Sequence, residues 1–282
     1  MGLEENVKIF QDTERVVKTN KRLIESVKES SRKQILIPEY MNVSDFMEIS
    51  SSEYNHNSTV VVSKKRSYEA ASAYKDKVVC VHNFASATNP GGGVTKGSSA
   101  QEECLCRCST LYFNLNTSAM WSGFYSPHRA EQNPIHNDDC IYTPNVVVIK
   151  SDTASPMLMD ENDWYEVNVI TCAAPNLRLM PSNAMNSGDG NKRVKLSDDD
   201  LYELHVKRLT RIMEIAKAGK NEVVILGAFG CGAFENNPEV VAKASKNVID
   251  KFIRDFETIE FAIYCSPRDE QNYHIFKKYL EV

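Results

Sequence analysis

The residues best suited to chemistry are a glycine run and an acidic pair that lie close together in the sequence. They are three consecutive glycines and, after seven intervening residues, a Gln-Glu-Glu triplet: Gly91, Gly92, Gly93, Gln101, Glu102 and Glu103. Glycine lacks a Cβ, so the backbone of such a run can approach a ligand closely and present N–H groups to it. Carboxylates at a predicted helix start are stabilised by the positive end of the helix dipole. Alone, the pattern is more typical of a surface loop before an acidic helical turn.

A second glycine-rich loop, residues 227–237 with the sequence GAFGCGAFENN, lies between an apolar strand and a helix. Such a loop can bind an anion, because backbone N–H groups and the helix dipole both point toward the ligand. Phe234 in this loop could stack on a ring or line a sugar, and Asn83 and Asn89 beside the first loop could bind a polyol. Both loops follow predicted buried strands, so we expect them at the carboxyl edge of one sheet, where open α/β folds bind ligands. Together they favour a phosphate-containing ligand.

Other reactive side chains form weaker patterns. Cys104, Cys106 and Cys108 suggest a metal site, but on a helix Cys106 points away from the other two, and no histidine lies nearby at ligand spacing. We therefore expect buried structural thiols and no metal. His82 at a predicted strand end is best interpreted as structural. Cys231 lies inside the second glycine loop and stays open as a nucleophile.

The elements that must position these loops follow from hydrophobic periodicity and capping residues. Short β-rich apolar runs alternate with helical patterns, which is typical of strands buried on both faces. Pro38 should stop the first helix, Ser197 should cap a later one, and Pro238 should open another. The stretch 42–57 shows no clean period, so we expect irregular structure there. The predicted strands are 59–63, 78–81, 146–149, 167–171, 223–226 and 261–264, and the predicted helices include 12–37, 68–74, 100–115, 197–219 and 269–279.

This alternation predicts an α/β fold in which a mixed or parallel sheet lies between helical layers. The alternating unit starts near residue 70. We therefore divide the chain into a mainly helical N-terminal extension, residues 1–70, and an α/β domain, residues 71–282, that contains both glycine loops. No internal repeat is visible.

Composition limits the possible partners. The 282 residues carry a net charge of −5, which argues against a broad basic groove for nucleic acid, although glycine loops can bind phosphate without net charge. No apolar run is long enough to span a membrane, and the N-terminus lacks a secretion signal. We expect a monomer with reduced cysteines in the cytoplasm, or in the nucleus if the source is eukaryotic.

Four segments resemble one enzyme family. The strings NFASATNPGGG with the following QEE, GAFGCGAFENNP, IYTPNVVVIKSD and VITCAAPN are similar to those of bacterial-type poly(ADP-ribose) glycohydrolases, which belong to the macrodomain superfamily. The likeness covers most of residues 68–282. It implies a macrodomain-like three-layer α/β/α sandwich with a mixed central sheet. It also implies ADP-ribose and poly(ADP-ribose) as product and substrate, ADP-ribosylated proteins as further partners, and no cofactor.

The same resemblance implies a role for each matching residue. Glu103 would be the catalytic acid, Glu102 would hold ribose hydroxyls, and Gln101 would position the loop. The remaining matches would contact the substrate. The diphosphate would be contacted on one side by Gly91, Gly92, Gly93 and Val94, and on the other side by Gly230, Cys231, Gly232 and Ala233. Phe234 would contact the distal ribose, and Asn89 would contact a ribose. The chain departs from the family pattern at Phe229, where tryptophan is usual, and at Ser86, where other macrodomain branches often carry asparagine.

The implied reaction is hydrolysis of a ribose–ribose O-glycosidic bond, mainly from the chain end, through an oxocarbenium-like transition state. Successive helical residues diverge by about 100°, so Glu102 and Glu103 are not expected to form the facing pair of an ordinary glycosidase. One carboxyl would then serve as acid and base, with a pKa raised by burial or by its neighbour. Two alternatives stay open: removal of mono-ADP-ribose from protein or nucleic acid, and a non-catalytic ADP-ribose reader.

Overall fold

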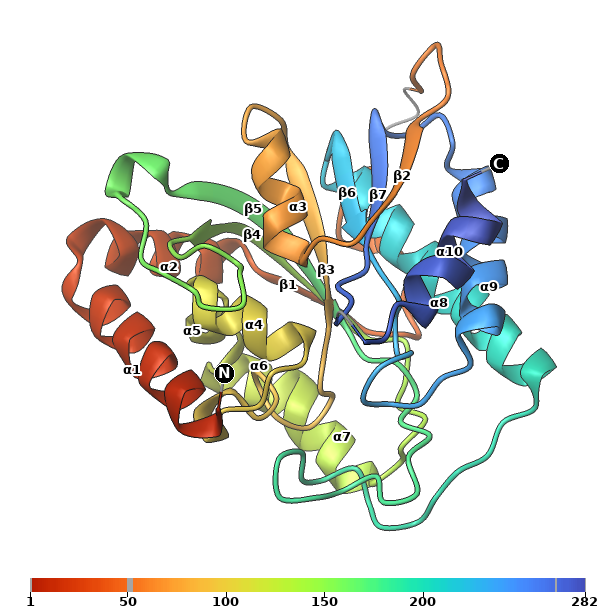
Figure 1. Ribbon diagram of the computed structural model, residues 1–282, viewed down its shortest axis with the longest axis horizontal. Helices are drawn as coiled ribbons and strands as arrows, with labels where there is room; N and C mark the ends of the chain where they lie inside the picture. The colour runs from red at the N-terminus through yellow and green to blue at the C-terminus, as the bar shows by residue number, and fades with distance from the viewer. Residues whose placement is uncertain (1, 50–52, 267, 282) are drawn as a thin grey trace.

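A seven-stranded mixed sheet forms the centre of the computed structural model, which describes residues 2–49, 53–266 and 268–281 (Figure 1). The strand order is β1-β4-β5-β3-β6-β7-β2. The pairs from β5 through β2 are parallel, whereas β4 runs antiparallel to both β1 and β5. The strands are β1 (Ile35–Ile37), β2 (Thr59–Ser63), β3 (Val79–Phe84), β4 (Cys140–Val148), β5 (Tyr165–Cys172), β6 (Val223–Leu226) and β7 (Thr258–Ala262).

Helices cover both faces of this sheet, which confirms the predicted three-layer architecture (Figure 1). One apolar core joins the sheet to the three C-terminal helices, α8 (Asp198–Ala218), α9 (Pro238–Lys251) and α10 (Gln271–Leu280). A second core joins the opposite face to α1 and to the short helices α3 (Ser67–Ala71), α4 (Gln101–Cys108) and α5 (Leu111–Leu115). Further short helices are α6 (Ser118–Met120) and α7 (Ser126–Glu131).

The first helical segment differs from its prediction. Instead of one helix over 12–37, the chain forms α1 (Leu3–Thr19), α2 (Lys21–Lys33) and then the edge strand β1. Asn20 causes the break, because it takes an extended conformation and its side chain accepts hydrogen bonds from the first N–H groups of α2. The run Ile35–Ile37 leaves the helical pattern because it pairs antiparallel with β4.

Both edge strands of the sheet come from residues before position 70. β1 pairs with β4 at one edge and β2 pairs with β7 at the other. The strand at 59–63 is therefore confirmed, and the N-terminal segment contributes to the sheet as well as to the helical layer. The division into residues 1–70 and 71–282 stays a prediction.

Other elements also differ in extent from the sequence pattern, and two of them have a clear cause. The predicted helix 100–115 is divided into α4 and α5, because Ser109 is extended and forms a β-bridge with Val148. β7 begins at Thr258, earlier than predicted, because Glu260 lies inside the strand. Its carboxylate accepts hydrogen bonds from Ser63 Oγ at 2.5 Å and Tyr74 Oη at 2.7 Å, which satisfies a buried charge that breaks the apolar pattern.

The predicted caps of the long helices are confirmed. Ser197 Oγ accepts the backbone N–H of Asp200 at 3.1 Å, and Pro238 occupies the first turn of α9. Among the described residues, no helix is long and apolar enough to cross a membrane.

Candidate active site

The two glycine loops lie at the carboxyl ends of β3 and β6, as predicted, and these strands are neighbours in the sheet. They border one cavity of about 850 Å³. Its lining includes eight of the predicted catalytic and substrate-binding residues: Gly92, Gln101, Glu102, Glu103, Gly230, Gly232, Ala233 and Phe234.

The first loop needs glycine for both conformation and space. Gly91 and Gly92 have φ angles of +69° and +57°, a region that side-chain-bearing residues rarely adopt. A Cβ on Gly92 would lie 2.5 Å from Glu103 Oε1 and 3.2 Å from Glu102 Oε2. Both carboxyl groups therefore approach the same point of the loop, although they are successive residues of a helix.

Glu103 has the geometry of a general acid. Its side chain is buried at the cavity wall, and Oε1 accepts the backbone N–H of Gly93 at 2.8 Å. Its other oxygen, Oε2, is buried without a hydrogen-bond partner among the described residues. Burial raises the pKa of Glu103, and the Gly93 N–H only partly opposes this effect. One oxygen is thus fixed by the loop, and the other is free to carry a proton.

Glu102 is held more tightly than Glu103. Ser86 N–H donates to Oε2 at 2.8 Å, and Asn83 Nδ2 donates to Oε1 at 3.2 Å. Burial raises the pKa of Glu102 to about 8 against the hydrogen bond from Ser86, and the neighbouring Glu103 raises it further. Asn83 is fully buried, so its amide orients Glu102, and the structure does not place it as a polyol ligand.

Gln101 connects the start of α4 to the end of β3. Its Oε1 accepts the N–H of Phe84 at 2.9 Å, while Nε2 donates to the carbonyl oxygen of His82 at 2.7 Å and to Ser67 Oγ at 3.0 Å. These three bonds fix the helix that carries both glutamates relative to the sheet.

The second loop presents its turn to the same cavity. Gly230 has a φ of +77°, and a Cβ there would lie 2.7 Å from the Cβ of Ala174. Gly232 is exposed, with no atom within 4 Å of a Cβ position, so this backbone is open to a ligand. Cys231 does not line the cavity: its Sγ donates to the carbonyl oxygen of Phe229 at 3.6 Å, and burial raises the pKa of the thiol. Cys231 is therefore not activated as a nucleophile.

Two further predicted ligands point into the protein. Val94 is fully buried in the core. The Asn89 amide donates to the carbonyl oxygen of Ser187 at 2.7 Å and to Asn186 Oδ1 at 3.1 Å, and its Oδ1 accepts from Arg129 Nη1 at 3.1 Å. Neither residue lines the cavity, and neither do Gly91 and Gly93.

The structure adds cavity residues that the sequence did not reveal. The Arg66 guanidinium lies 3.8 Å from the ring centroid of Tyr264, and Arg178 lies 5.3 Å from that of Phe234. The other additions include Asp152, Asn183, Ala184, Met185, Asn186 and Asn272. The residues 183–186 lie in an irregular segment that carries no periodic signal, so the sequence pattern could not single them out.

His82 and the cysteines are also located by the structure. His82 is buried, its ring lies 4.4 Å from that of Phe229, and burial lowers its pKa to about 3, as expected for a structural residue. All eight cysteines are free. Among the described residues, no group of three or more His, Cys, Asp or Glu side chains could hold a metal ion.

Solved structures of similar fold come from two bacteria. Poly(ADP-ribose) glycohydrolase from Thermomonospora curvata matches with a TM-score of 0.83 and 23% identity, covering 98% of this chain and 100% of that one. The same enzyme bound to the inhibitor ADP-HPD gives a TM-score of 0.79 at 23% identity, covering 98% and 99%. Poly(ADP-ribose) glycohydrolase from Deinococcus radiodurans in complex with ADP-ribose gives 0.75 at 26% identity, covering 90% and 96%. No curated protein matches the chain.

The family of the chain is assigned from its sequence. The family model for the microbial-type PARG catalytic domain matches residues 4–151, which is more than half of the chain and includes the first glycine loop and both glutamates. The chain therefore belongs to the microbial-type PARG catalytic-domain family.

Proposed function

We propose that this protein is a poly(ADP-ribose) glycohydrolase that hydrolyses ribose–ribose O-glycosidic bonds, mainly from the chain end, and releases ADP-ribose. Family membership supports the reaction, and the fold shared with the ADP-ribose-bound enzyme supports the ligand. The single observation that carries the proposal is the Glu103 carboxyl, buried at the cavity wall with one oxygen held by Gly93 and the other unpartnered among the described residues.

The proposed reaction uses one carboxyl twice. Burial raises the pKa of Glu103 and so favours its protonated form, which can donate its proton to the leaving 2′-oxygen as the C1″–O bond breaks. The sugar then carries oxocarbenium-like charge, which the substrate's own diphosphate stabilises. Water attacks the same carbon, and the Glu103 carboxylate accepts its proton, which restores the acid. One carboxyl suffices because the two proton transfers occur in sequence at the same side of the sugar.

Glu102 has a different proposed role. Its two oxygens already accept from Ser86 and Asn83, so its position is fixed before substrate binds. With a pKa of about 8, it is mostly protonated at neutral pH and can donate to a ribose hydroxyl. We therefore assign it to ribose binding beside the acid.

The glycine loops are proposed to bind the diphosphate from two sides. The Gly92 region and the turn from Gly230 to Ala233 border the same cavity, and Phe234, which also lines it, is proposed to pack on the distal ribose. Val94 and Asn89 support the loop from inside, and we do not assign them direct contacts. Free cysteines support a reducing compartment, and we propose the cytoplasm and a monomer.

The test compares Glu103→Gln with the wild-type chain on two substrates, poly(ADP-ribose) and a mono-ADP-ribosylated protein. Loss of the general acid should lower polymer turnover by about 10²- to 10⁴-fold, while calorimetry still detects ADP-ribose binding. The matched control is Glu235→Gln, an exposed carboxyl on the second loop that does not line the cavity.

Each other outcome selects a different function. A wild-type chain that binds ADP-ribose and releases nothing from either substrate is a reader. Release of ADP-ribose from the modified protein, with the polymer intact, identifies a mono-ADP-ribosyl hydrolase.

A further inference from the structure

Arg178 is a cavity residue to which the proposed reaction gives no role. It lies in the irregular segment that follows β5, and its half-buried guanidinium stacks near the Phe234 ring. Two of its nitrogens are already fixed, since Nε donates to Asn176 Oδ1 at 3.0 Å and Nη2 donates to the carbonyl oxygen of Pro181 at 3.1 Å. A guanidinium held in this way has little conformational freedom left to lose on binding a ligand.

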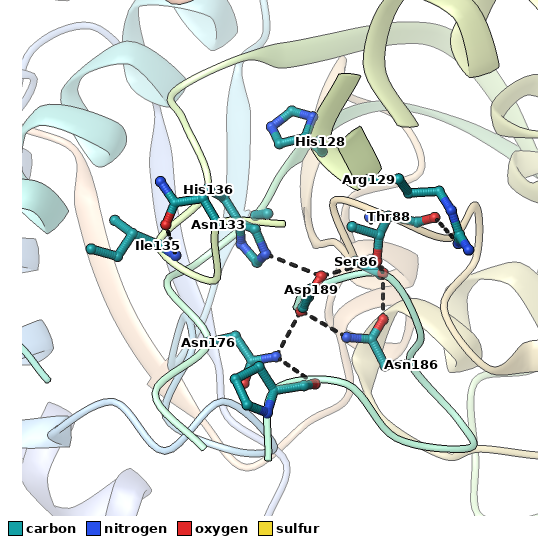
Figure 2. Close-up of polar contacts among 12 residues, drawn as sticks. Ser86, Thr88, His128, Arg129, Asn133, Ile135, His136, Asn176, Asn186 and Asp189 are labelled. Atoms are coloured by element: carbon teal, nitrogen blue, oxygen red, sulfur yellow. Dashed lines mark hydrogen bonds and ion pairs between the residues drawn. The ribbon is translucent and has the colours of Figure 1, made fainter. Parts of the chain in front are cut away.

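The support behind Arg178 is a buried carboxylate. Asp189 Oδ2 accepts from Asn176 Nδ2 at 2.7 Å and from Asn186 Nδ2 at 2.9 Å, and its Oδ1 accepts from Thr88 Oγ1 at 2.9 Å (Figure 2). His136 Nε2 lies 3.3 Å from the same Oδ1. Asp189 is 1% exposed, so these contacts form in the interior. They tie the Arg178 segment to the first glycine loop, because Thr88 belongs to that loop.

His136 belongs to the same cluster. Its Nδ1 lies 2.8 Å from the carbonyl oxygen of Ala174, so Nδ1 carries a hydrogen and donates. This bond fixes the imidazole ring beside Asp189.

Glu103 lies toward the Arg178 end of the cavity. Gly93, whose N–H holds Glu103, packs against the segment that follows Arg178: a Cβ on Gly93 would lie 3.1 Å from the carbonyl oxygen of Met185. Burial lowers the pKa of the Arg178 guanidinium, and the carboxyls of Asp189, Glu235 and Glu103 oppose this effect, so Glu103 lies within electrostatic reach of Arg178.

Residues of β7, α10 and α3 and their flanks also line the cavity, including Ile263, Asn272 and the stacked pair of Arg66 and Tyr264. These residues could contact the rest of a terminal ADP-ribosyl unit whose distal ribose is at Glu103 and whose diphosphate is on the glycine loops. In that arrangement, the group that leaves from C1″ would depart past Arg178.

We propose that Arg178 is a specificity-determining residue that binds the leaving ADP-ribose unit of the polymer through its phosphates, held in place by Asn176 and Asp189. This inference rests on the proposed function. An arginine matches a phosphate because its planar fork can donate two parallel hydrogen bonds to it. The site would favour substrates whose leaving group is itself a nucleotide over substrates with a small neutral leaving group.

The experiment measures kcat and KM for Arg178→Gln and Arg178→Lys on poly(ADP-ribose) and on ADP-ribose with a p-nitrophenyl group at the distal C1. The ratio of kcat/KM for polymer to kcat/KM for the aryl substrate should fall about tenfold in Arg178→Gln, mainly through the polymer KM. Arg178→Lys should give an intermediate ratio, because it keeps the charge and loses the fork. Arg193→Gln is the matched control, since Arg193 is an exposed arginine of the same segment outside the cavity lining.

The result separates this inference from the proposed function. Wild-type cleavage of polymer establishes the function before any variant is compared, and a wild-type chain that cleaves none overturns both proposals. If Arg178→Gln lowers the two kcat/KM values and the ADP-ribose affinity by the same factor, Arg178 belongs to the product side and the inference is wrong. An unchanged ratio also overturns it.

Discussion

Gly92→Ala is the perturbation that tests the geometry of the site most directly. The added Cβ would lie 2.5 Å from Glu103 Oε1 and 3.2 Å from Glu102 Oε2, on a residue whose φ is +57°. The substitution removes no side-chain atom of the site, and the charge of the protein does not change. The variant therefore displaces the proposed acid without deleting it.

The expected losses of rate and of stability follow separately from the structure. Oε1 must move by roughly 0.9 Å to reach ordinary contact at 3.4 Å, and this shift stretches its 2.8 Å hydrogen bond from Gly93. A misplacement of about 1 Å in a catalytic group costs about 10²-fold in rate, so kcat should fall by that factor. The stability cost should be smaller, about 1–2 kcal/mol for an alanine in the left-handed region, because the carboxyl is the movable end of a side chain.

The assay is polymer turnover at substrate saturation, with thermal unfolding and ADP-ribose calorimetry on the same preparations. We expect a folded protein with a slightly lower midpoint, ADP-ribose binding that persists, and kcat lowered about 10²-fold. Turnover within threefold of the wild type, in a variant with the expected loss of stability, would refute the assignment of Glu103 as the positioned acid.

Two further predictions concern the same helix. The pKa of Glu102 rises from 4.5 to about 8 on folding, so the folded state binds more protons between these values and the free energy of unfolding falls as pH rises through that window. In urea titrations, Glu102→Gln should reduce the fall in the free energy of unfolding between pH 5 and 8 by up to a few kcal/mol. A variant whose free energy of unfolding falls as steeply with pH as that of the wild type would contradict this prediction. Gln101→Glu should lower stability by about 1–3 kcal/mol in thermal unfolding, because a carboxylate oxygen would face the His82 carbonyl oxygen that now accepts from Nε2. An unchanged unfolding midpoint would show that this bond does not hold the helix.

The residues around the two loops were predictable because their signals are local. Glycines without a Cβ, glutamates at a helix start and apolar runs before both loops all lie within short windows of sequence. The parallel pairing of β3 with β6 then brings the loops together, as the rule for strand carboxyl ends predicts. The convergence of Glu102 and Glu103 on Gly92 was not predictable from the angle between successive helical residues, because it depends on side-chain rotamers and on the path of the loop.

The errors of prediction have a shared physical cause. The strand at Ile35–Ile37 depends on a partner strand more than 100 positions later, and no local window contains that partner. Asn89 looks like a ligand in the sequence, yet its amide is used within the loop network. Arg178 looks like an ordinary loop residue, and only the buried contacts of Asp189 show that it is held. Polar residues in irregular segments are fixed by tertiary contacts, which local periodicity does not encode.

The acidic character of the site and the anionic character of its ligand are compatible for a specific reason. A chain with net charge −5 that buries two glutamates beside the loop proposed to bind phosphate would repel a diphosphate if both carboxyls were ionised. Burial instead raises the pKa of both and favours their protonated forms, which would offer protons, beside the backbone N–H groups, to the ligand. The bound diphosphate adds negative charge nearby and raises these pKa values further, and by linkage protonation strengthens diphosphate binding to the same extent. Substrate binding therefore favours the protonated form of Glu103 that the first step of the reaction requires.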